Sequence, residues 1–78
     1  MPKSLHTPRQ QHLLELLVKL RKTHRLTQAE VARKLRRPQS FVAKYEGGER
    51  RLDVIEFIEV VRALSADPLD VLAQLLRV

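Results

Sequence analysis

The stretch TQAEVARKLRRPQSFVAKYEGG, residues 27–48, decides the fold of this chain. Its first part carries a capping box, because Thr27 is followed three residues later by Glu30. In this pattern the two side chains satisfy backbone N–H groups at the start of a helix. The sequence therefore predicts a helix that begins after Thr27, buries its apolar face and ends near Leu35.

A second short helix follows in the same stretch. Pro38 blocks continuation of the preceding helix but suits the first turn of a new one. Two glycines, Gly47 and Gly48, then provide a C-terminal stop. We expect this helix to run from about Pro38 or Gln39 to Glu46.

Two helices this short, joined by so short a turn, can pack only at a steep angle. Ala32 is small enough to allow close approach at the crossing, and Val42 and Tyr45, three residues apart, face inward together. We expect Tyr45 to be a core residue with a hydrogen-bonded hydroxyl. The outward side of the second helix then carries four residues: Gln39, Ser40, Ala43 and Lys44.

Further helix starts lie on both sides of this pair. Thr7 before Pro8 predicts a helix that continues to about Thr23 along an apolar face. Asp53 and Glu56 form a cap-like pair, and Asp67 before a proline opens a last helix. No strand pattern is present, so we predict an all-α domain of five helices joined by short turns.

Positive charge is concentrated in the middle of the chain. The 78 residues carry a net charge of +6, and eleven of the fifteen basic residues lie between positions 19 and 51, together with only three acids. A localised field of this kind indicates a polyanionic partner, either nucleic acid or an anionic membrane surface. The alternative is a solvated basic surface with no partner.

Other classes of function find little support. The chain has no cysteine, no pattern of a signal peptide and no apolar run long enough for a membrane span, so we expect a cytoplasmic protein. His6, His12 and His24 lack metal-ligand spacing. Ser40 has no plausible His–Asp partners and no glycine-rich loop is present. We therefore expect no metal, no cofactor, no small-molecule ligand and no enzymatic activity.

The segments LTQAEVARKL and PQSFVAKYEGGERRLDVIEFIEVVRAL together resemble the lambda-repressor/Cro type of helix-turn-helix, the XRE family. The resemblance implies a lambda-repressor-like domain over residues 1–78, with its helix-turn-helix at about 27–46. It implies binding to double-stranded DNA, with the helix from about Gln39 in the major groove. The matching base contacts are Gln39, Ser40, Ala43 and Lys44.

The resemblance also implies contacts to the DNA backbone. Arg21 matches an arginine near the backbone that pairs with a glutamate ending the recognition helix, here Glu46. Gln28 matches a phosphate-contacting glutamine at a helix N-terminus, which is a natural phosphate site. The full set of expected phosphate contacts is Arg21, Thr27, Gln28, Arg37, Arg50 and Arg51.

Two residues near the turn carry separate expectations. Arg36 stands where the family usually has a glycine at positive φ, and an arginine there costs about 1 kcal/mol in strain. Phe41 falls on the exposed side of the recognition helix in this pattern, where a large apolar group needs a partner. It covers the neighbouring loop or packs on a sugar or thymine methyl of bound DNA.

The last helix, at about 67–78, is apolar around most of its circumference. Leu72, with Leu75 or Leu69, is expected to serve the core of the monomer, which leaves other apolar residues uncovered. We predict that they form the interface of a homodimer, and Leu16 and Ile55 could join it. A frayed, exposed tail is the alternative. The predicted interface residues are Leu69, Ala73, Leu76 and Val78.

These features favour a small, bacterial or phage-encoded transcriptional regulator acting as a homodimer on a palindromic operator. An autoregulatory repressor is the first hypothesis. A restriction–modification controller, or an antitoxin with a toxin protein as partner, fits the same sequence. A protein-interaction module of helix-turn-helix ancestry that no longer binds DNA is the alternative from another class.

Overall fold

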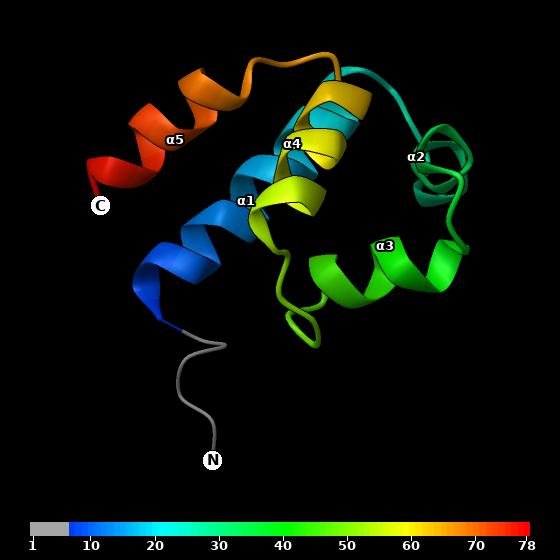
Figure 1. Cartoon of the computed structure of the whole chain (residues 1–78), viewed down its shortest axis with the longest axis horizontal. Coiled ribbons are helices and arrows are strands. Elements are labelled where there is room, and N and C mark those ends of the chain that lie inside the picture. The colour runs from blue at the N-terminus through cyan, green and yellow to red at the C-terminus, as the bar shows by residue number, and fades with distance from the viewer. Residues whose placement is uncertain (1–6) are drawn as a thin grey trace.

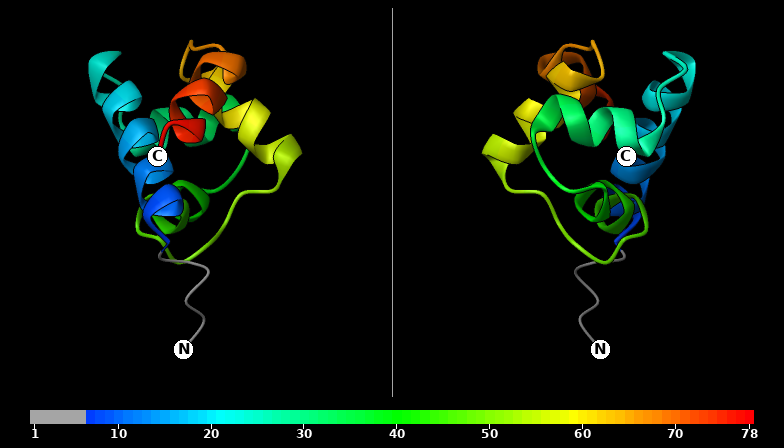
Figure 2. Two further views of the ribbon diagram at one scale, coloured as in Figure 1. Left: turned by 90° about the vertical axis from the view of Figure 1, so that its left-hand side faces the viewer. Right: turned by 90° about the vertical axis from the view of Figure 1, so that its right-hand side faces the viewer.

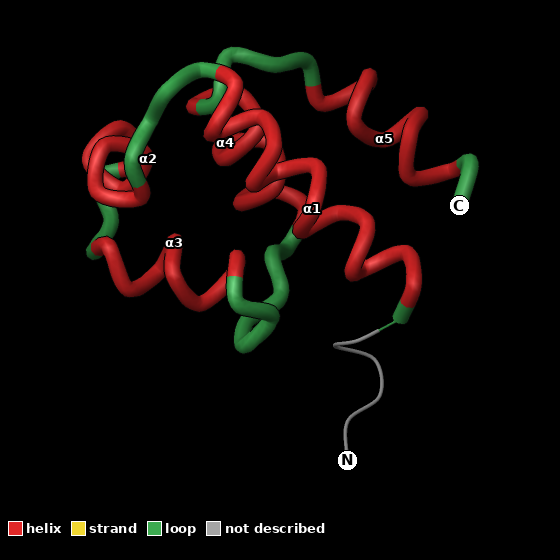
Figure 3. Tube along the Cα trace, turned by 180° about the vertical axis from the view of Figure 1, so that it is seen from behind, coloured by secondary structure: helices red, strands yellow, loops and turns green. Residues whose placement is uncertain are grey.

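The computed structural model describes residues 7–78, and these form five α-helices and no strand (Figures 1 and 3). The predicted all-α class is confirmed. The helices are α1 (Pro8–Thr23), α2 (Gln28–Leu35), α3 (Gln39–Glu46), α4 (Val54–Ala63) and α5 (Pro68–Leu76).

Helix starts follow the predicted side-chain caps. In α2 the Thr27 hydroxyl accepts the Glu30 N–H at 3.1 Å, and the Glu30 carboxylate accepts the Thr27 N–H at 2.8 Å. Asp53 and Glu56 form the same reciprocal pair at 2.7 and 3.0 Å. Each pair satisfies backbone donors that would otherwise lack a partner. The four predicted caps are all present: Thr7, Thr27, Asp53 and Asp67.

The helices pack around one core. Figures 1 and 2 show α1 and α4 in the middle, α2 and α3 on one side and α5 on the other. Helix α2 packs on α3 and α4, whereas α5 packs on α1 and α4. The short α2–α3 pair is thus held against two longer elements. The fully buried side chains are Leu17, Val31, Val42, Tyr45, Val60, Val61, Leu64 and Val71.

The predicted packing of α2 on α3 is confirmed. The two helices are in contact, Ala32 is buried, and Val42 and Tyr45 are completely buried. The expectation of a hydrogen-bonded Tyr45 hydroxyl is wrong, because this buried oxygen has no partner among residues 7–78. Burial raises the pKa of Tyr45, because the phenolate would lose its hydration.

Phe41 corrects the prediction of an exposed residue. Only 7% of its surface is accessible, and its ring meets the Tyr45 ring edge-on at 5.5 Å between centroids. The guanidinium carbons of Arg37 and Arg50 lie 4.5 and 4.9 Å from the Phe41 centroid. Because Arg50 belongs to the α3–α4 loop, the expectation that Phe41 contacts this loop is confirmed. The side of α3 that carries Phe41, predicted to be exposed, is therefore covered by arginines from outside the helix.

Helix α5 presents a different face to the core than predicted. Val71 and Leu75 are buried, whereas Leu72 is 44% exposed and Leu69 is 73% exposed. Leu75 was among the expected core residues, but Leu72 was placed there wrongly. In a helix that is apolar on nearly every side, the apolar pattern does not specify which face packs. The packing of α5 on α1 and α4 accompanies the burial of Val71 and Leu75.

Among residues 7–78, three residues besides glycine adopt left-handed backbone conformations, and each lies just after a helix. Arg36 has φ 57° and ψ 43° after α2, as expected, and Arg25 and Ser65 have φ 56° and 60°. A Cβ at such a position crowds the backbone, so glycine is the preferred residue there. The chain therefore accepts local strain at these three helix ends.

We expect Ser65→Gly to raise the free energy of unfolding by about 1 kcal/mol, because it removes the Cβ strain at positive φ. Ser65 is exposed and lies far from α3, which leaves other contacts intact. Urea denaturation measures the change. Ser65→Ala, which keeps the Cβ, is the control and should give no such gain. Equal effects of the two substitutions would show that the strain is absent.

Candidate nucleic-acid interface

The outward face of α3 is a row of small and polar side chains. Phe41, Val42 and Tyr45 are buried, and the Glu46 side chain is held in an ion pair, so the other side of the helix is turned to solvent. Proline at the N-cap, without a side-chain cap, and the Gly47 end keep this helix to two turns. The exposed residues on this face are the four predicted ones: Gln39, Ser40, Ala43 and Lys44. Their side chains supply amide, hydroxyl, methyl and ammonium groups, which can contact the edges of base pairs.

The C-terminal end of α3 is tied to α1 and α2 by one carboxylate. Arg21 donates to Glu46 through Nε at 2.7 Å and Nη2 at 3.1 Å, and it also donates to the Leu26 carbonyl at 3.0 Å. The expected Arg21–Glu46 pair is confirmed. This two-point hydrogen bond raises the pKa of Arg21. The side chains of both partners are largely buried, so the pair fixes the orientation of α3.

Gln28 joins the same cluster. Its side-chain amide donates to the Glu46 carboxylate at 2.9 Å. The residue is half-buried at the first position of α2. Because its side-chain amide already donates a hydrogen bond to Glu46, only its remaining hydrogen-bonding groups are free to contact a phosphate. The Thr27 hydroxyl likewise acts as the α2 cap. The backbone N–H groups at this helix end remain the more direct donors to a phosphate.

Arg37 and Arg50 meet at the flank of α3. Both guanidinium groups lie on the Phe41 ring, one from the α2–α3 turn and one from the α3–α4 loop. Cations are attracted to the face of an aromatic ring, and the planar guanidinium also stacks on it. The two side chains remain 38% and 39% exposed. The structure thus brings these two predicted phosphate contacts together beside α3.

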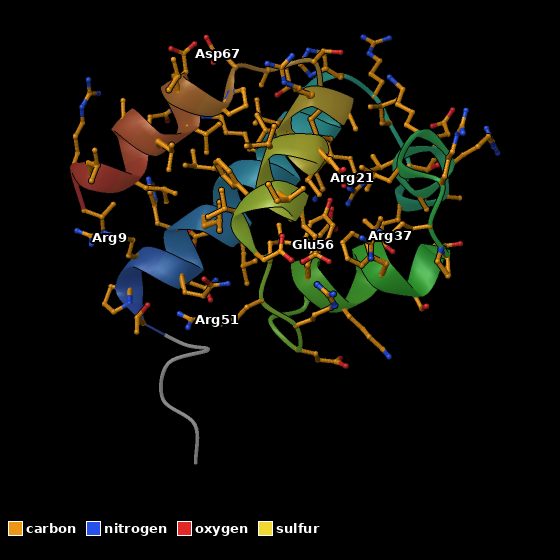
Figure 4. The ribbon with its side chains drawn as sticks, viewed as in Figure 1. Arg9, Arg21, Arg37, Arg51, Glu56 and Asp67 are labelled. Atoms are coloured by element: carbon orange, nitrogen blue, oxygen red, sulfur yellow. The ribbon has the colours of Figure 1, made fainter. Side chains whose placement is uncertain are left out.

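Glu56 is the functional candidate that the sequence reasoning missed. Its carboxylate accepts from Nη1 and Nη2 of Arg50 at 2.9 and 2.8 Å, and Nη1 of Arg37 lies 3.4 Å away. Figure 4 shows Arg37 and Glu56 between α3 and the N-terminal end of α4. The Asp53–Glu56 spacing identified a helix cap, but the sequence gives no sign that two distant arginines meet there. These hydrogen bonds lower the pKa of Glu56 to about 2.

Arg51 points elsewhere. In Figure 4 it lies near the start of α1, and it shares a shallow hollow with Pro8, Leu13 and Val78. It is exposed and makes no ion pair within residues 7–78. The structure therefore does not bring Arg51 into the Arg37–Arg50 cluster, although both loop arginines were predicted to contact phosphate.

A separate apolar surface covers the outer side of α5 and the start of α4. Leu69 and Leu76 are each about three-quarters exposed. Next to them lies a hollow of about 330 Å³ between α4 and α5, lined mainly by leucine, valine, isoleucine and phenylalanine side chains. Its exposed members on α4 and α5 are Val54, Ile55, Leu69, Leu72, Ala73 and Leu76, whereas Val78, also predicted for the interface, lines the hollow at the start of α1. Contiguous exposed apolar groups commonly mark an interaction site.

The described residues offer little for other chemistry. Within 7–78, no three histidine, cysteine or acidic side chains gather closely enough to hold a metal ion. No helix in this part of the chain has the length and apolar character that crossing a bilayer demands. His6, considered above as a metal ligand, lies outside the described residues.

Two comparisons with known proteins give matches. Residues 12–78 match the model of a helix-turn-helix domain family. A solved structure of an "XRE-family like protein" from Pseudomonas syringae pv. tomato str. DC3000 is 48% identical to this chain, with a TM-score of 0.89. The alignment covers 96% of this chain and 92% of that one. A search among curated proteins gave no match.

The low pKa of Glu56 predicts a specific loss of stability in acid. A carboxylate whose pKa falls from 4.5 to about 2 on folding stabilises the protein above pH 4.5, and this contribution disappears as the pH falls toward 2. The difference in Tm between wild type and Glu56→Gln should therefore shrink over this range. Glu59→Gln, at an exposed acid on the same helix without an ion pair within residues 7–78, is the control for the removal of one charge. A constant difference for Glu56→Gln would contradict the ion-pair geometry.

Proposed function

This chain belongs to the XRE-type helix-turn-helix family, a family of DNA-binding regulators, and we propose that it is a sequence-specific transcriptional regulator of double-stranded DNA. The observation that carries the proposal is the row of exposed side chains on α3, beside cationic groups on the same side of the molecule. As a regulator of this family it acts where bacterial or phage DNA lies, in the cytoplasm.

In the proposed complex α3 enters the major groove. Gln39 can contact adenine through two hydrogen bonds, Lys44 can reach O6 and N7 of guanine, and Ala43 can touch a thymine methyl. Ser40 can donate to or accept from several base edges. These four residues give sequence discrimination because they project from a helix whose opposite side is fixed in the core.

Backbone contacts supply most of the affinity in this proposal. Arg37 and Arg50 flank α3, and the N-terminal end of α2 offers N–H groups and partial positive charge to a phosphate. Each neutralised phosphate releases bound counterions, so affinity falls as salt rises. Such contacts set the register of the protein on the duplex but carry no base preference.

We further infer that two copies bind together as a repressor of a palindromic operator. The apolar surface on α5 supports this inference, because its leucines are exposed and it lies on the opposite side of the molecule from α3 (Figures 1 and 2). A two-fold dimer would place two α3 helices about one DNA turn apart, roughly 34–36 Å. A dimer covering an operator represses by excluding other proteins from it.

Selection of bound sites from a random duplex library tests the function. We expect wild type to enrich one inverted repeat. Lys44→Ala should lose the preference at one base pair and about 1–3 kcal/mol of binding to the enriched site. Arg37→Ala, the comparison variant at a proposed phosphate contact, should weaken binding to all duplexes alike, with a shallower salt dependence. Equal losses on enriched and random duplexes for Lys44→Ala would contradict its assignment as a base contact.

The dimer inference is tested by mass in solution. Analytical ultracentrifugation should give twice the 9.1 kDa chain mass for wild type and a single chain mass for Leu76→Glu, because the new charge would be buried at the interface. Gln74→Glu adds the same charge on the polar strip of α5 and should remain dimeric. A monomeric wild type at tens of micromolar would contradict the inference. Capture of a stoichiometric second protein from native extracts would instead support the antitoxin alternative.

A further inference from the structure

Glu56 does more than cap a helix. For the cap alone, one carboxylate oxygen accepts the Asp53 N–H at 3.0 Å. The equivalent glutamate of α2, Glu30, makes its cap at the surface and forms no ion pair with an arginine in the described part of the chain. Glu56 is instead buried, as the Glu46 side chain is, and both of its oxygens accept hydrogen bonds from the Arg50 guanidinium. Its position therefore has a second role.

The second role concerns two cations on one aromatic ring. Arg37 and Arg50 both lie within 5 Å of the Phe41 centroid, so their like charges repel each other. The Glu56 carboxylate is the counter-ion that both share. Without this anion, neither long side chain would be held in one conformation against the ring, because an exposed arginine otherwise keeps many rotamers.

The cluster exposes its cations and buries its anion. The Glu56 side chain is 9% exposed, whereas those of Arg37 and Arg50 are 38% and 39% exposed. Arg50 uses three of its five N–H groups on Glu56 and on the Arg51 carbonyl, so two remain. The cluster thus keeps a net positive charge, and its two arginines are accessible to an anion from solvent.

We propose that Glu56 is a positioning residue of the DNA-binding surface: it holds Arg37 and Arg50 against Phe41 so that both guanidinium groups meet phosphates beside the groove occupied by α3. This inference rests on the proposed function. It has an unusual consequence, because a negative charge near DNA is expected to strengthen binding. The ordering of two cations outweighs the repulsion from one buried anion that they already neutralise.

The test compares two variants with the same charge change. Glu56→Gln and Glu59→Gln each remove one negative charge from α4, but Glu59 is exposed and has no ion pair within residues 7–78. Fluorescence anisotropy with a duplex at pH 7 gives affinity over a range of salt concentrations. Glu56→Gln should bind DNA roughly tenfold more weakly than wild type. Its slope of log binding constant against log salt concentration should be shallower by the amount expected for the loss of about two phosphate contacts. Glu59→Gln should bind as tightly as wild type or slightly more tightly.

A background without the two arginines isolates the positioning effect. In the Arg37→Ala/Arg50→Ala protein, adding Glu56→Gln should cause no further weakening, because no guanidinium group remains to be held. Circular dichroism must show that each variant is folded at the assay temperature. If Glu56→Gln does not fold, Phe41→Leu replaces it. This substitution removes the aromatic ring but retains an apolar side chain. It should give the same weaker DNA binding and the same shallower salt dependence.

The outcomes are distinct. If folded Glu56→Gln, or Phe41→Leu in its place, binds DNA as tightly as Glu59→Gln, the positioning role is overturned and the proposed function stands. The same holds if Glu56→Gln weakens binding equally in the background that lacks both arginines. If wild type itself shows no salt-dependent binding to duplexes, the proposed function fails, and the positioning role fails with it.

Discussion

The structure depends on holding an eight-residue helix in one orientation. Helix α3 is too short to be stable alone, since isolated helices of this length are marginal in water. Its inner side is fixed by Val42 and Tyr45, and buried carboxylates fix it at two further places. Glu46 ties its C-terminal end to α1 and α2, and Glu56 holds the arginines that cover Phe41. What remains free is the outward face.

These ion pairs reduce the number of basic residues whose charge is free to attract a polyanion. Eleven basic residues lie between positions 19 and 51, but Arg21, Arg37 and Arg50 have carboxylate partners within the protein. Such pairs add little to long-range attraction because their charges are partly cancelled. Their main effect is to fix the orientation of the arginine, because a guanidinium held by a carboxylate presents its remaining donors in a fixed direction. The other cations provide the general field around the surface.

The sequence predicts the helices well because their determinants are local. Thr27 and Asp53 start helices through side chains three residues away, and Gly47 ends one, so all five elements can be placed. The outward face of α3 follows as well. The burial of Phe41 does not, because two arginines from outside the helix cover it. The error at Leu72 has the same origin, since the packed side of an apolar helix depends on its neighbours.

The most direct measurement of the central claim is an amide chemical-shift titration of the ¹⁵N-labelled protein with duplex DNA. We expect the largest changes at the N-terminal end of α2, the turn at 36–38 and the outward face of α3. Signals from α5 should change little, because α5 lies away from the bound duplex. Changes concentrated on α5, with α3 unaffected at low salt, would contradict the account.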